Sequence, residues 1–146
     1  MILVDKKLIP AEILKDSILL HLAAAYFSIG KRLEQKTQCP QTRGFVMSTL
    51  RGGAVLNQNQ IATLLGIDRT VVHRSIKAMV EEGLVSEKKA KSGRALLVQL
   101  TAKGNKYREY LIKERRAVEE KLRKQLTPEE IAVLIRLLKV AAELEF

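Results

Sequence analysis

The sequence predicts a mainly α-helical protein with one small β-hairpin. Three observations support this fold class. Apolar residues recur at the three- and four-residue spacing of helices over most of the 146 residues. Two short runs around a Lys-Ser-Gly turn have the pattern of paired strands. Residues that cap helices stand at the start of several helical stretches.

The N-terminal part is predicted to form one long helix over residues 10–36. Its apolar residues form one row at helical spacing, with a second row beside it: Leu14, Ile18, Leu22, Ala25, Ile29 and Leu33, then Ile13, Leu20, Ala24 and Phe27. So wide a stripe needs cover on more than one side, which a small single domain rarely supplies. Residues 37–41 are expected to form a loop, and residues 42–51 a short helix ended by a Gly-Gly pair.

Residues 57–83 are predicted to form two short helices joined by a tight turn, which is a helix-turn-helix. Asn57 caps the first helix, with Gln60 three residues later as in a capping box, and Gly66 ends it. Asp68 caps the second helix, which stops near Gly83. The predicted buried residues are Ile61, Leu64 and Leu65 in the first helix, and Val72, Ile76, Met79 and Val80 in the second.

A hairpin and two more helices follow. Residues 84–89 and 94–100 are predicted to be strands on either side of a Lys91-Ser92-Gly93 turn. Thr101 ends the second strand and caps a long charged helix over residues 102–124. Thr127, Pro128 and Glu130 then occupy the N-cap, first and third positions of a last helix. Because that helix is apolar nearly all round, it must be buried, and a partner chain is the economical cover.

Positive charge is concentrated in the middle of the chain. The protein carries a formal net charge of +10, and residues 42–104 hold ten basic and four acidic residues, whereas residues 125–146 have a net charge of −2. A basic centre flanked by apolar ends favours a polyanion-binding lobe between self-association segments. Composition leaves open the alternative that excess Lys and Arg only keep the protein soluble.

Several function classes are disfavoured. The sequence has no glycine-rich phosphate loop, nucleophile elbow, paired carboxylates in an apolar setting or metal-ligand spacing, so we expect no enzyme, cofactor or metal. Its longest apolar stretch is about half the ~20 residues that span a bilayer, and no signal-peptide pattern is present. We therefore expect a cytoplasmic protein with no membrane partner. For Cys39, a structurally neutral role is favoured over an oxidant sensor activated by Arg43 or Lys36.

The second helix of the helix-turn-helix presents a polar face suited to DNA. At about 100° per residue, this face lies opposite the buried one. Its first turn is where a recognition helix meets base edges or phosphates. We predict groove contacts by Arg69, Thr70, His73 and Arg74, a phosphate contact by Lys77, and a further contact by Gln58 at the start of the preceding helix. The alternative is an ordinary solvated face, as any exposed helix face is polar; a contact that changes with pH is a further reading of His73.

The hairpin tip carries a second basic cluster. It consists of Lys88, Lys89, Lys91 and Arg94, around the flexible Gly93. A narrow minor groove has a negative potential that attracts Arg, and such a loop can enter it. The alternative is a solvated charged loop.

The order of these elements resembles the MarR family of bacterial and archaeal transcription regulators over nearly the whole chain, most specifically in residues 56–104. Residues 56–62 resemble the start of the family's first helix-turn-helix element, and residues 69–74 the opening of its recognition helix. Residues 82–85 resemble the entry to its wing, and residues 100–104 the exit. Two positions differ from the family pattern. Ser92 stands where the wing usually carries Asp, and Arg43-Gly44 stands where a Gln-Phe pair is usual.

The resemblance implies a winged helix-turn-helix with N- and C-terminal dimerisation helices, in an obligate homodimer on a palindromic site. Residues 1–41 would be the N-terminal dimerisation helix and loop, residues 42–104 the DNA-binding lobe, and residues 105–146 the C-terminal dimerisation helices. It further implies a small aromatic effector held between the dimerisation helices and the lobe. Tyr26, Phe27, Phe45 and Met47 would line that ligand site, although core packing is the favoured alternative for these side chains.

Three functions remain open on the sequence. The favoured one is a homodimeric, sequence-specific double-stranded DNA-binding regulator, a repressor relieved by a small-molecule effector. The second is a winged-helix module that binds a protein or RNA. The third is an architectural DNA binder without sequence preference.

Overall fold

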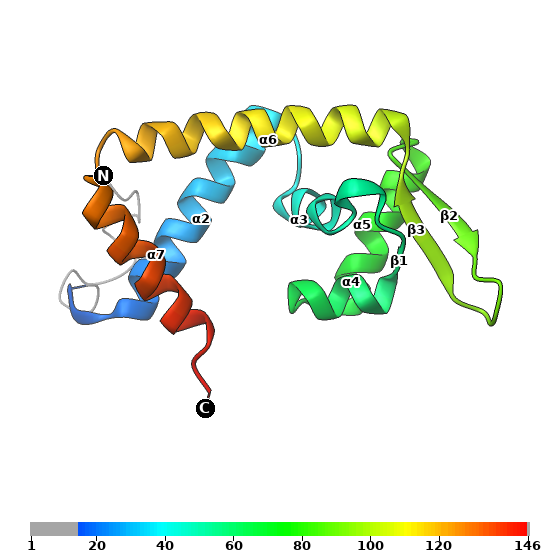
Figure 1. Ribbon diagram of the computed structural model, residues 1–146, viewed down its shortest axis with the longest axis horizontal. Coiled ribbons are helices and arrows are strands. Elements are labelled where there is room, and N and C mark those ends of the chain that lie inside the picture. The colour runs from blue at the N-terminus through cyan, green and yellow to red at the C-terminus, as the bar shows by residue number, and fades with distance from the viewer. Residues whose placement is uncertain (1–14, 146) are drawn as a thin grey trace. The chain divides into compact units, whose positions relative to one another are not determined.

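The computed structural model describes residues 15–145 (Figure 1). From Ile18 onward it contains seven segments of helix or helical turn and three strands. In chain order these are α2 (Ile18–Thr37), α3 (Gln41–Thr49), the 3-10 turn η1 (Arg51–Gly53), β1 (Leu56–Asn57), α4 (Gln58–Leu65), α5 (Arg69–Glu81), β2 (Val85–Lys89), β3 (Leu96–Leu100), α6 (Ala102–Arg123) and α7 (Pro128–Ala142). The chain divides into two compact units, Met1–Leu111 and Ile112–Phe146, with the boundary inside α6. The mainly helical fold class with a small hairpin is confirmed.

The helix predicted over residues 10–36 is interrupted at Ser17, because residues 15–16 are helical and α2 starts again at Ile18. Ser17 has an extended backbone (φ −91°, ψ 104°), and its hydroxyl accepts a hydrogen bond of 3.3 Å from the Leu20 amide. The prediction of one uninterrupted helix over residues 10–36 is therefore wrong at Ser17, and residues 10–14 lie outside the described part. A serine that satisfies a free amide competes with the helical hydrogen bond, so a helix starts there although the apolar pattern continues.

The core of the first unit lies among α3, α4, α5 and the sheet. Its buried side chains are Cys39, Val46, Met47, Leu50, Ile61, Ala62, Val72, Ile76, Met79, Leu84, Val85, Val98 and Leu111. The predicted burial of Ile61, Val72, Ile76 and Met79 is confirmed, and Leu65 is partly buried against this core. Two predictions of burial are wrong.

Leu64 is 64% exposed and Val80 is 37% exposed. In α4 the buried face is centred between Ile61 and Ala62, and at about 100° per residue Leu64 points well away from it. Val80 lies in the last turn of α5, at the edge of the apolar face defined by the three buried residues of that helix.

The sheet has the order β1-β3-β2, and both pairings are antiparallel. β2 and β3 form the predicted hairpin, with Val85 opposite Leu100 and Lys89 opposite Leu96. The Ala90 amide closes the connecting loop with a 2.9 Å hydrogen bond to the Ala95 carbonyl. The strand β1, which adds to the other edge of β3, was not predicted, because two residues are too short to show an alternating pattern.

The predicted helix caps are confirmed. Asn57 and Gln60 form a capping box with two reciprocal 2.9 Å hydrogen bonds at the start of α4. Thr127 and Glu130 form a second capping box at the start of α7, where Pro128 is the first helical residue. These side chains satisfy amides that would otherwise lack partners at the helix N-termini.

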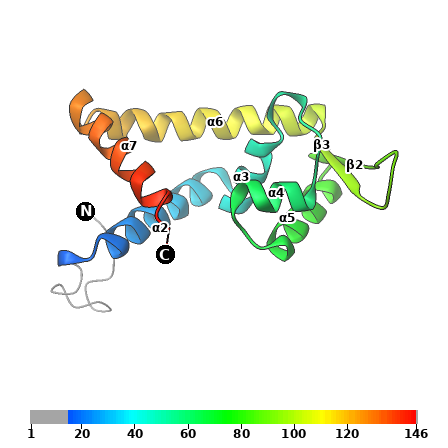
Figure 2. The same cartoon turned by 60° about the horizontal axis from the view of Figure 1, so that its bottom comes forward.

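Both terminal helices leave large apolar side chains uncovered in the single chain. α7 has no buried residue, and Gly30 is the buried residue of α2. The exposed large apolar side chains of these two helices are Ile18, Leu19, Tyr26, Phe27, Ile29, Val133, Leu134, Ile135, Leu137, Leu138 and Val140. In Figure 2, α2 extends away from the group formed by α3, α4 and α5. Among residues 15–145, no helix is long and apolar enough to cross a membrane.

Candidate nucleic-acid interface

The helix α5 starts from a tight turn that the local sequence specifies. Gly66 adopts the left-handed conformation (φ 63°) at the end of α4, and the Ile67 amide then donates to the Ala62 carbonyl at 3.2 Å. Asp68 caps α5, with its carboxylate accepting a 2.7 Å hydrogen bond from the Thr70 amide. That hydrogen bond lowers the pKa of Asp68 below its ordinary value, which keeps the cap charged at neutral pH.

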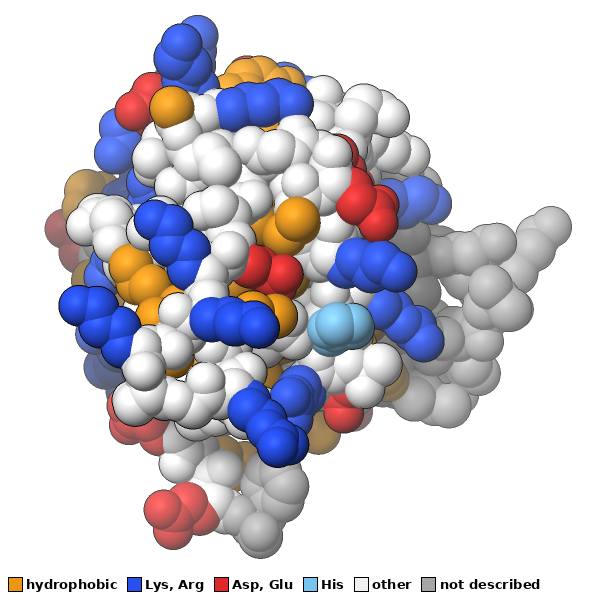
Figure 3. All heavy atoms as spheres, turned by 90° about the vertical axis from the view of Figure 1, so that its right-hand side faces the viewer, with side chains coloured by type: hydrophobic (Ala, Val, Ile, Leu, Met, Phe, Trp, Pro, Cys, Tyr) orange, Lys and Arg blue, Asp and Glu red, His pale blue; other side chains and the backbone are white. Residues whose placement is uncertain are grey.

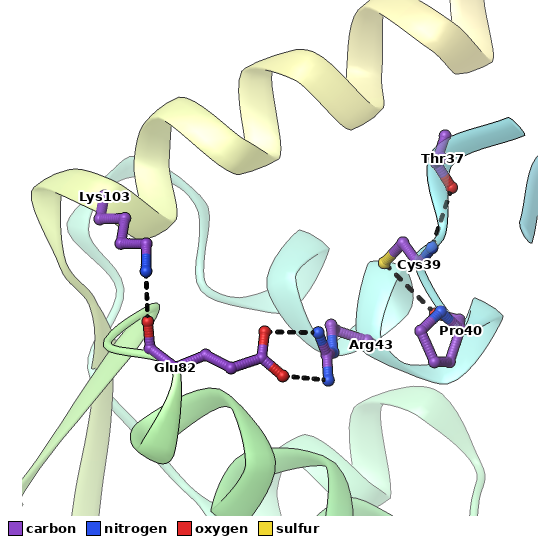
Figure 4. Close-up of polar contacts among 6 residues, drawn as sticks. All are labelled: Thr37, Cys39, Pro40, Arg43, Glu82 and Lys103. Carbon is purple, nitrogen blue, oxygen red and sulfur yellow. Dashed lines mark hydrogen bonds and ion pairs between the residues drawn. The ribbon is translucent and has the colours of Figure 1, made fainter.

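The other end of α5 is tied to two distant elements. Glu82, which follows the last residue of α5, accepts two 2.8 Å hydrogen bonds from the Arg43 guanidinium of α3 (Figure 4). The Lys103 ammonium, from the first turn of α6, donates to the Glu82 backbone carbonyl at 2.6 Å. A bidentate pair fixes direction as well as distance, so the C-terminal end of α5 has a defined position relative to α3 and α6. This link could not be predicted from the sequence, since 39 residues separate Arg43 from Glu82 and no local pattern connects them.

The exit of the hairpin is fastened to the same point. The Thr101 hydroxyl donates to the Gly83 carbonyl at 2.6 Å and accepts from the Gly104 amide at 3.0 Å. The Thr101 amide donates to the Leu84 carbonyl at 3.1 Å. The predicted capping role of Thr101 is confirmed, and its contact with Gly83 joins the start of α6 to the turn that follows α5.

The polar face predicted for α5 is exposed. Arg69, Thr70, His73, Arg74 and Lys77 all lie on the solvent side of the helix, opposite its buried apolar residues. Figure 3 shows Lys and Arg side chains spread over the face that carries the hairpin, with a His side chain among them. Within residues 15–145 no ion pair neutralises these bases of α5, so the face is free to meet an anionic partner.

The hairpin supplies a second exposed basic group. Lys88 and Lys89 end β2, and Lys91 and Arg94 lie in the connecting loop; all four are exposed. Gly93 has a φ of 108°, a conformation that L side chains rarely adopt, so a glycine is required at the tip. The structure thus places Lys88 and Lys89 in the last paired positions of β2, and Lys91 and Arg94 in the loop beyond the paired strands.

Gln58 is held differently from the other predicted contact residues. Its amide lies between two polar side chains, 3.1 Å from His73 Nδ1 on α5 and 3.4 Å from a Glu87 carboxylate oxygen on β2. Glu87 was not among the predicted residues. The signal that could have identified it is its spacing of two from Val85, since alternation along a strand places both on the same face, and Val85 is buried.

The four side chains predicted for a ligand site fall into two groups. Met47 is fully buried in the core, as the core-packing alternative expects. Tyr26 and Phe27 pack edge to face on α2 with ring centroids 5.5 Å apart, and they are 50% and 66% exposed. Phe45 on α3 is 38% exposed. Tyr26 and Phe27 are therefore not packed into the core of the single chain.

Cys39 is a buried thiol, 4% exposed, in the connection between α2 and α3. Burial raises its pKa above the ordinary value, although a hydrogen bond from the Tyr107 hydroxyl opposes this rise. The thiol donates to the Pro40 carbonyl at 3.5 Å (Figure 4). Burial together with the cysteine hydrogen bond raises the pKa of Tyr107 to about 12. A protonated, enclosed thiol is a structural residue, because the thiolate is the reactive form.

The chain matches one family model in part and shares its fold with several solved structures. Residues 45–95 match a family model described as the MarR family. The structure of an Escherichia coli MarR variant with operator DNA is 21% identical, with a TM-score of 0.74, and the match covers 94% of this chain and 97% of that one. The Staphylococcus aureus MepR–DNA complex is 20% identical, with a TM-score of 0.79 and coverage of 88% and 98%. Bordetella bronchiseptica BpsR, whose DNA binding is regulated by 6-hydroxynicotinic acid, is 18% identical, with a TM-score of 0.75 and coverage of 87% and 100%. No curated protein sequence matches the chain.

Proposed function

We propose that the chain is a MarR-family winged-helix transcriptional regulator that represses transcription by binding a palindromic DNA operator as a homodimer. The observation that carries this proposal is the unneutralised basic face of α5, a helix fastened at both ends and followed by a basic hairpin. A rigid helix with exposed donors is the element that reads a major groove.

In this proposal each subunit places α5 in a major groove and its hairpin in the adjacent minor groove. Arg69, Thr70, His73 and Arg74 face base edges, and Lys77 contacts a phosphate. The wing residues Lys88, Lys89, Lys91 and Arg94 approach the minor groove, whose negative potential attracts them. With Ser92 in place of an acidic residue, no carboxylate at that position restrains Arg94, so we expect its minor-groove contact to be less sequence-selective.

The homodimer is supported by the uncovered apolar surfaces of α2 and α7. Each helix alone exposes several large aliphatic or aromatic side chains, and contiguous apolar surface of this kind marks an interface in a protein of this size. A second copy of the chain supplies matching surfaces by symmetry. We propose that residues 1–41 and 105–146 form the dimerisation segments and residues 42–104 the DNA-binding lobe, in the cytoplasm.

We propose further that a small aromatic effector relieves repression. BpsR responds to such a molecule, and this chain keeps three exposed aromatic side chains, Tyr26, Phe27 and Phe45, on α2 and α3. Aromatic rings that the single chain does not bury are suited to stack against a planar ligand. Met47 is excluded from this role because it is fully buried.

The proposal is tested by selection from a random duplex pool with the full-length protein at physiological salt, with the complex sized by light scattering. We expect a palindrome with half-sites about 10 base pairs apart, bound by one dimer. Affinity should fall with salt at a log-log slope of about −0.9 for each phosphate neutralised. Binding without enrichment would instead indicate an architectural DNA binder. No duplex binding would favour a module for protein or RNA.

A double variant assigns the binding to α5. Arg69→Ala with Arg74→Ala removes two bases from the exposed face, and we expect loss of the preference for the selected operator. Lys121→Ala with Lys124→Ala removes the same charge from exposed positions beyond the first unit and serves as the control. Equal effects of the two double variants, with both still dimeric by light scattering, would show that net charge, and not the face of α5, accounts for binding.

A further inference from the structure

The amide of Gln58 has one chemically allowed orientation. A carboxylate only accepts hydrogen bonds, so the Gln58 group that faces Glu87, at 3.4 Å, must be the NH₂. The Gln58 carbonyl oxygen is then the atom that faces His73 Nδ1, at 3.1 Å. Three elements, β2, α4 and α5, thereby meet in one chain of polar contacts.

This orientation determines which nitrogen of His73 carries the proton. The Gln58 carbonyl oxygen accepts and cannot donate, so His73 Nδ1 must donate to it. In a neutral imidazole the other nitrogen, Nε2, is then an acceptor with a free lone pair. Among residues 15–145 no hydrogen bond of the structure occupies Nε2, and the side chain is exposed on the polar face of α5.

We infer that Glu87, acting through Gln58, is a positioning residue that fixes His73 as a hydrogen-bond acceptor toward the DNA and so selects an amino-bearing base. This inference rests on the proposed binding of duplex DNA by α5. In the major groove the donors are the N4 amino group of cytosine and the N6 amino group of adenine, whereas guanine presents acceptors. His73 therefore favours cytosine or adenine, while the exposed arginines beside it favour guanine.

Glu87 is the acidic group on which the orientation of Gln58, and through it the tautomer of His73, depends. On α5 the neighbours one turn away are Arg69 and Lys77, both cationic, and α4 contributes no titratable residue. Glu87 is the acidic residue that reaches the Gln58 amide. Gln58 itself is used to hold His73, so it acts as a positioning residue and not as the direct DNA contact that its place in the sequence suggested.

The tautomer is tested first on the free, full-length protein. Long-range ¹H–¹⁵N NMR at about pH 8, where a reference imidazole is neutral, distinguishes a proton on Nδ1 from one on Nε2. We expect Nδ1–H for His73 in the wild type and a mixture in Glu87→Gln, because a glutamine at 87 can either donate or accept. Nε2–H in the wild type, or an unchanged Nδ1–H in Glu87→Gln, would overturn the inference.

Base selection is tested next, at the same pH. His73→Ala identifies the operator position that depends on His73, as the position where base preference is lost. We expect the wild type to prefer cytosine or adenine there by about fivefold over guanine, and Glu87→Gln to lose most of that preference. Glu81→Gln, at an exposed carboxylate of α5, removes the same charge without touching Gln58 and should keep it.

The two readouts separate this inference from the proposed function. A general gain in affinity from removing a negative charge raises binding to all bases and leaves the preference unchanged. Preference for guanine at the His73 position, or equal behaviour of Glu87→Gln and Glu81→Gln, would contradict the inference while the operator stands. If the wild type selects no operator, the proposed function fails and the base selection with it, and the NMR result then decides the tautomer alone.

Discussion

Replacing Gly104 with alanine tests whether the start of α6 must touch the turn after α5. Gly104 is buried in the first turn of α6, and an added Cβ would overlap the Leu84 carbonyl oxygen and lie 3.2 Å from Leu100 Cδ2. The nearest obstacle is backbone and cannot rotate away as a flexible side chain would. The helix start therefore has to move away from the Leu84 backbone, just before β2.

Three contributions make up the expected change in the free energy of unfolding. Overpacking against a rigid group costs about 1 to 3 kcal/mol. Moving the helix start also weakens the Thr101 hydroxyl contacts with Gly83 and Gly104, which contribute about 1 kcal/mol. Alanine regains about 1 kcal/mol of helix propensity. We expect Gly104→Ala to lower the free energy of unfolding by about 2 kcal/mol.

Gly44 provides a matched control of opposite sign. It lies inside α3, and nothing stands within 4 Å of an added Cβ. Gly44→Ala should therefore stabilise the protein by about 0.5 to 1 kcal/mol through helix propensity alone. Urea unfolding followed by circular dichroism, at one protein concentration because dimerisation adds to stability, measures both changes. Wild-type stability of Gly104→Ala would refute the close contact between α6 and Leu84.

Three further predictions concern the packing around the candidate interface. The pKa of Tyr107 is raised from 10.0 to about 12 in the folded protein, so the neutral phenol is favoured there; stability is fully present below pH 10.0 and is lost as the pH rises toward 12. Tyr107→Phe should flatten that loss in unfolding curves taken across this range, and an unchanged pH dependence would argue against it. Arg43→Ala and Glu82→Ala, with the double variant, should give a coupling of about 1 kcal/mol in a double-mutant cycle, since Glu82 is 47% exposed and solvent screens the pair; a coupling near zero would mean that the bridge does not hold α5. Asn57→Ala removes the N-cap of α4 and should cost about 1 kcal/mol, whereas Asn57→Ser should restore most of it.

The candidate interface was predicted from the sequence where its signal is local. Thr70, His73, Arg74 and Lys77 share an exposed face because helical periodicity fixes their directions once Val72, Ile76 and Met79 are recognised as apolar. The wing cluster was found because turn residues and basic residues coincide in the hairpin. Glu87 escaped prediction, since its importance comes from contact with Gln58, 29 residues earlier, and its charge is opposite to that expected of a DNA-binding surface.

The sequence by itself determined the order, the type and most of the ends of the described elements, because caps, turn glycines and apolar periodicity act over a few residues. It also determined that the middle of the chain is basic and that the end helices are apolar. Only the tertiary structure decided that Leu64 is exposed, that Met47 is core, and that a two-residue strand joins the hairpin. Only the tertiary structure brought Arg43 into contact with Glu82, and Glu87 into contact with Gln58. Contacts between residues far apart in the chain depend on how several elements pack at once, and no local pattern carries that information.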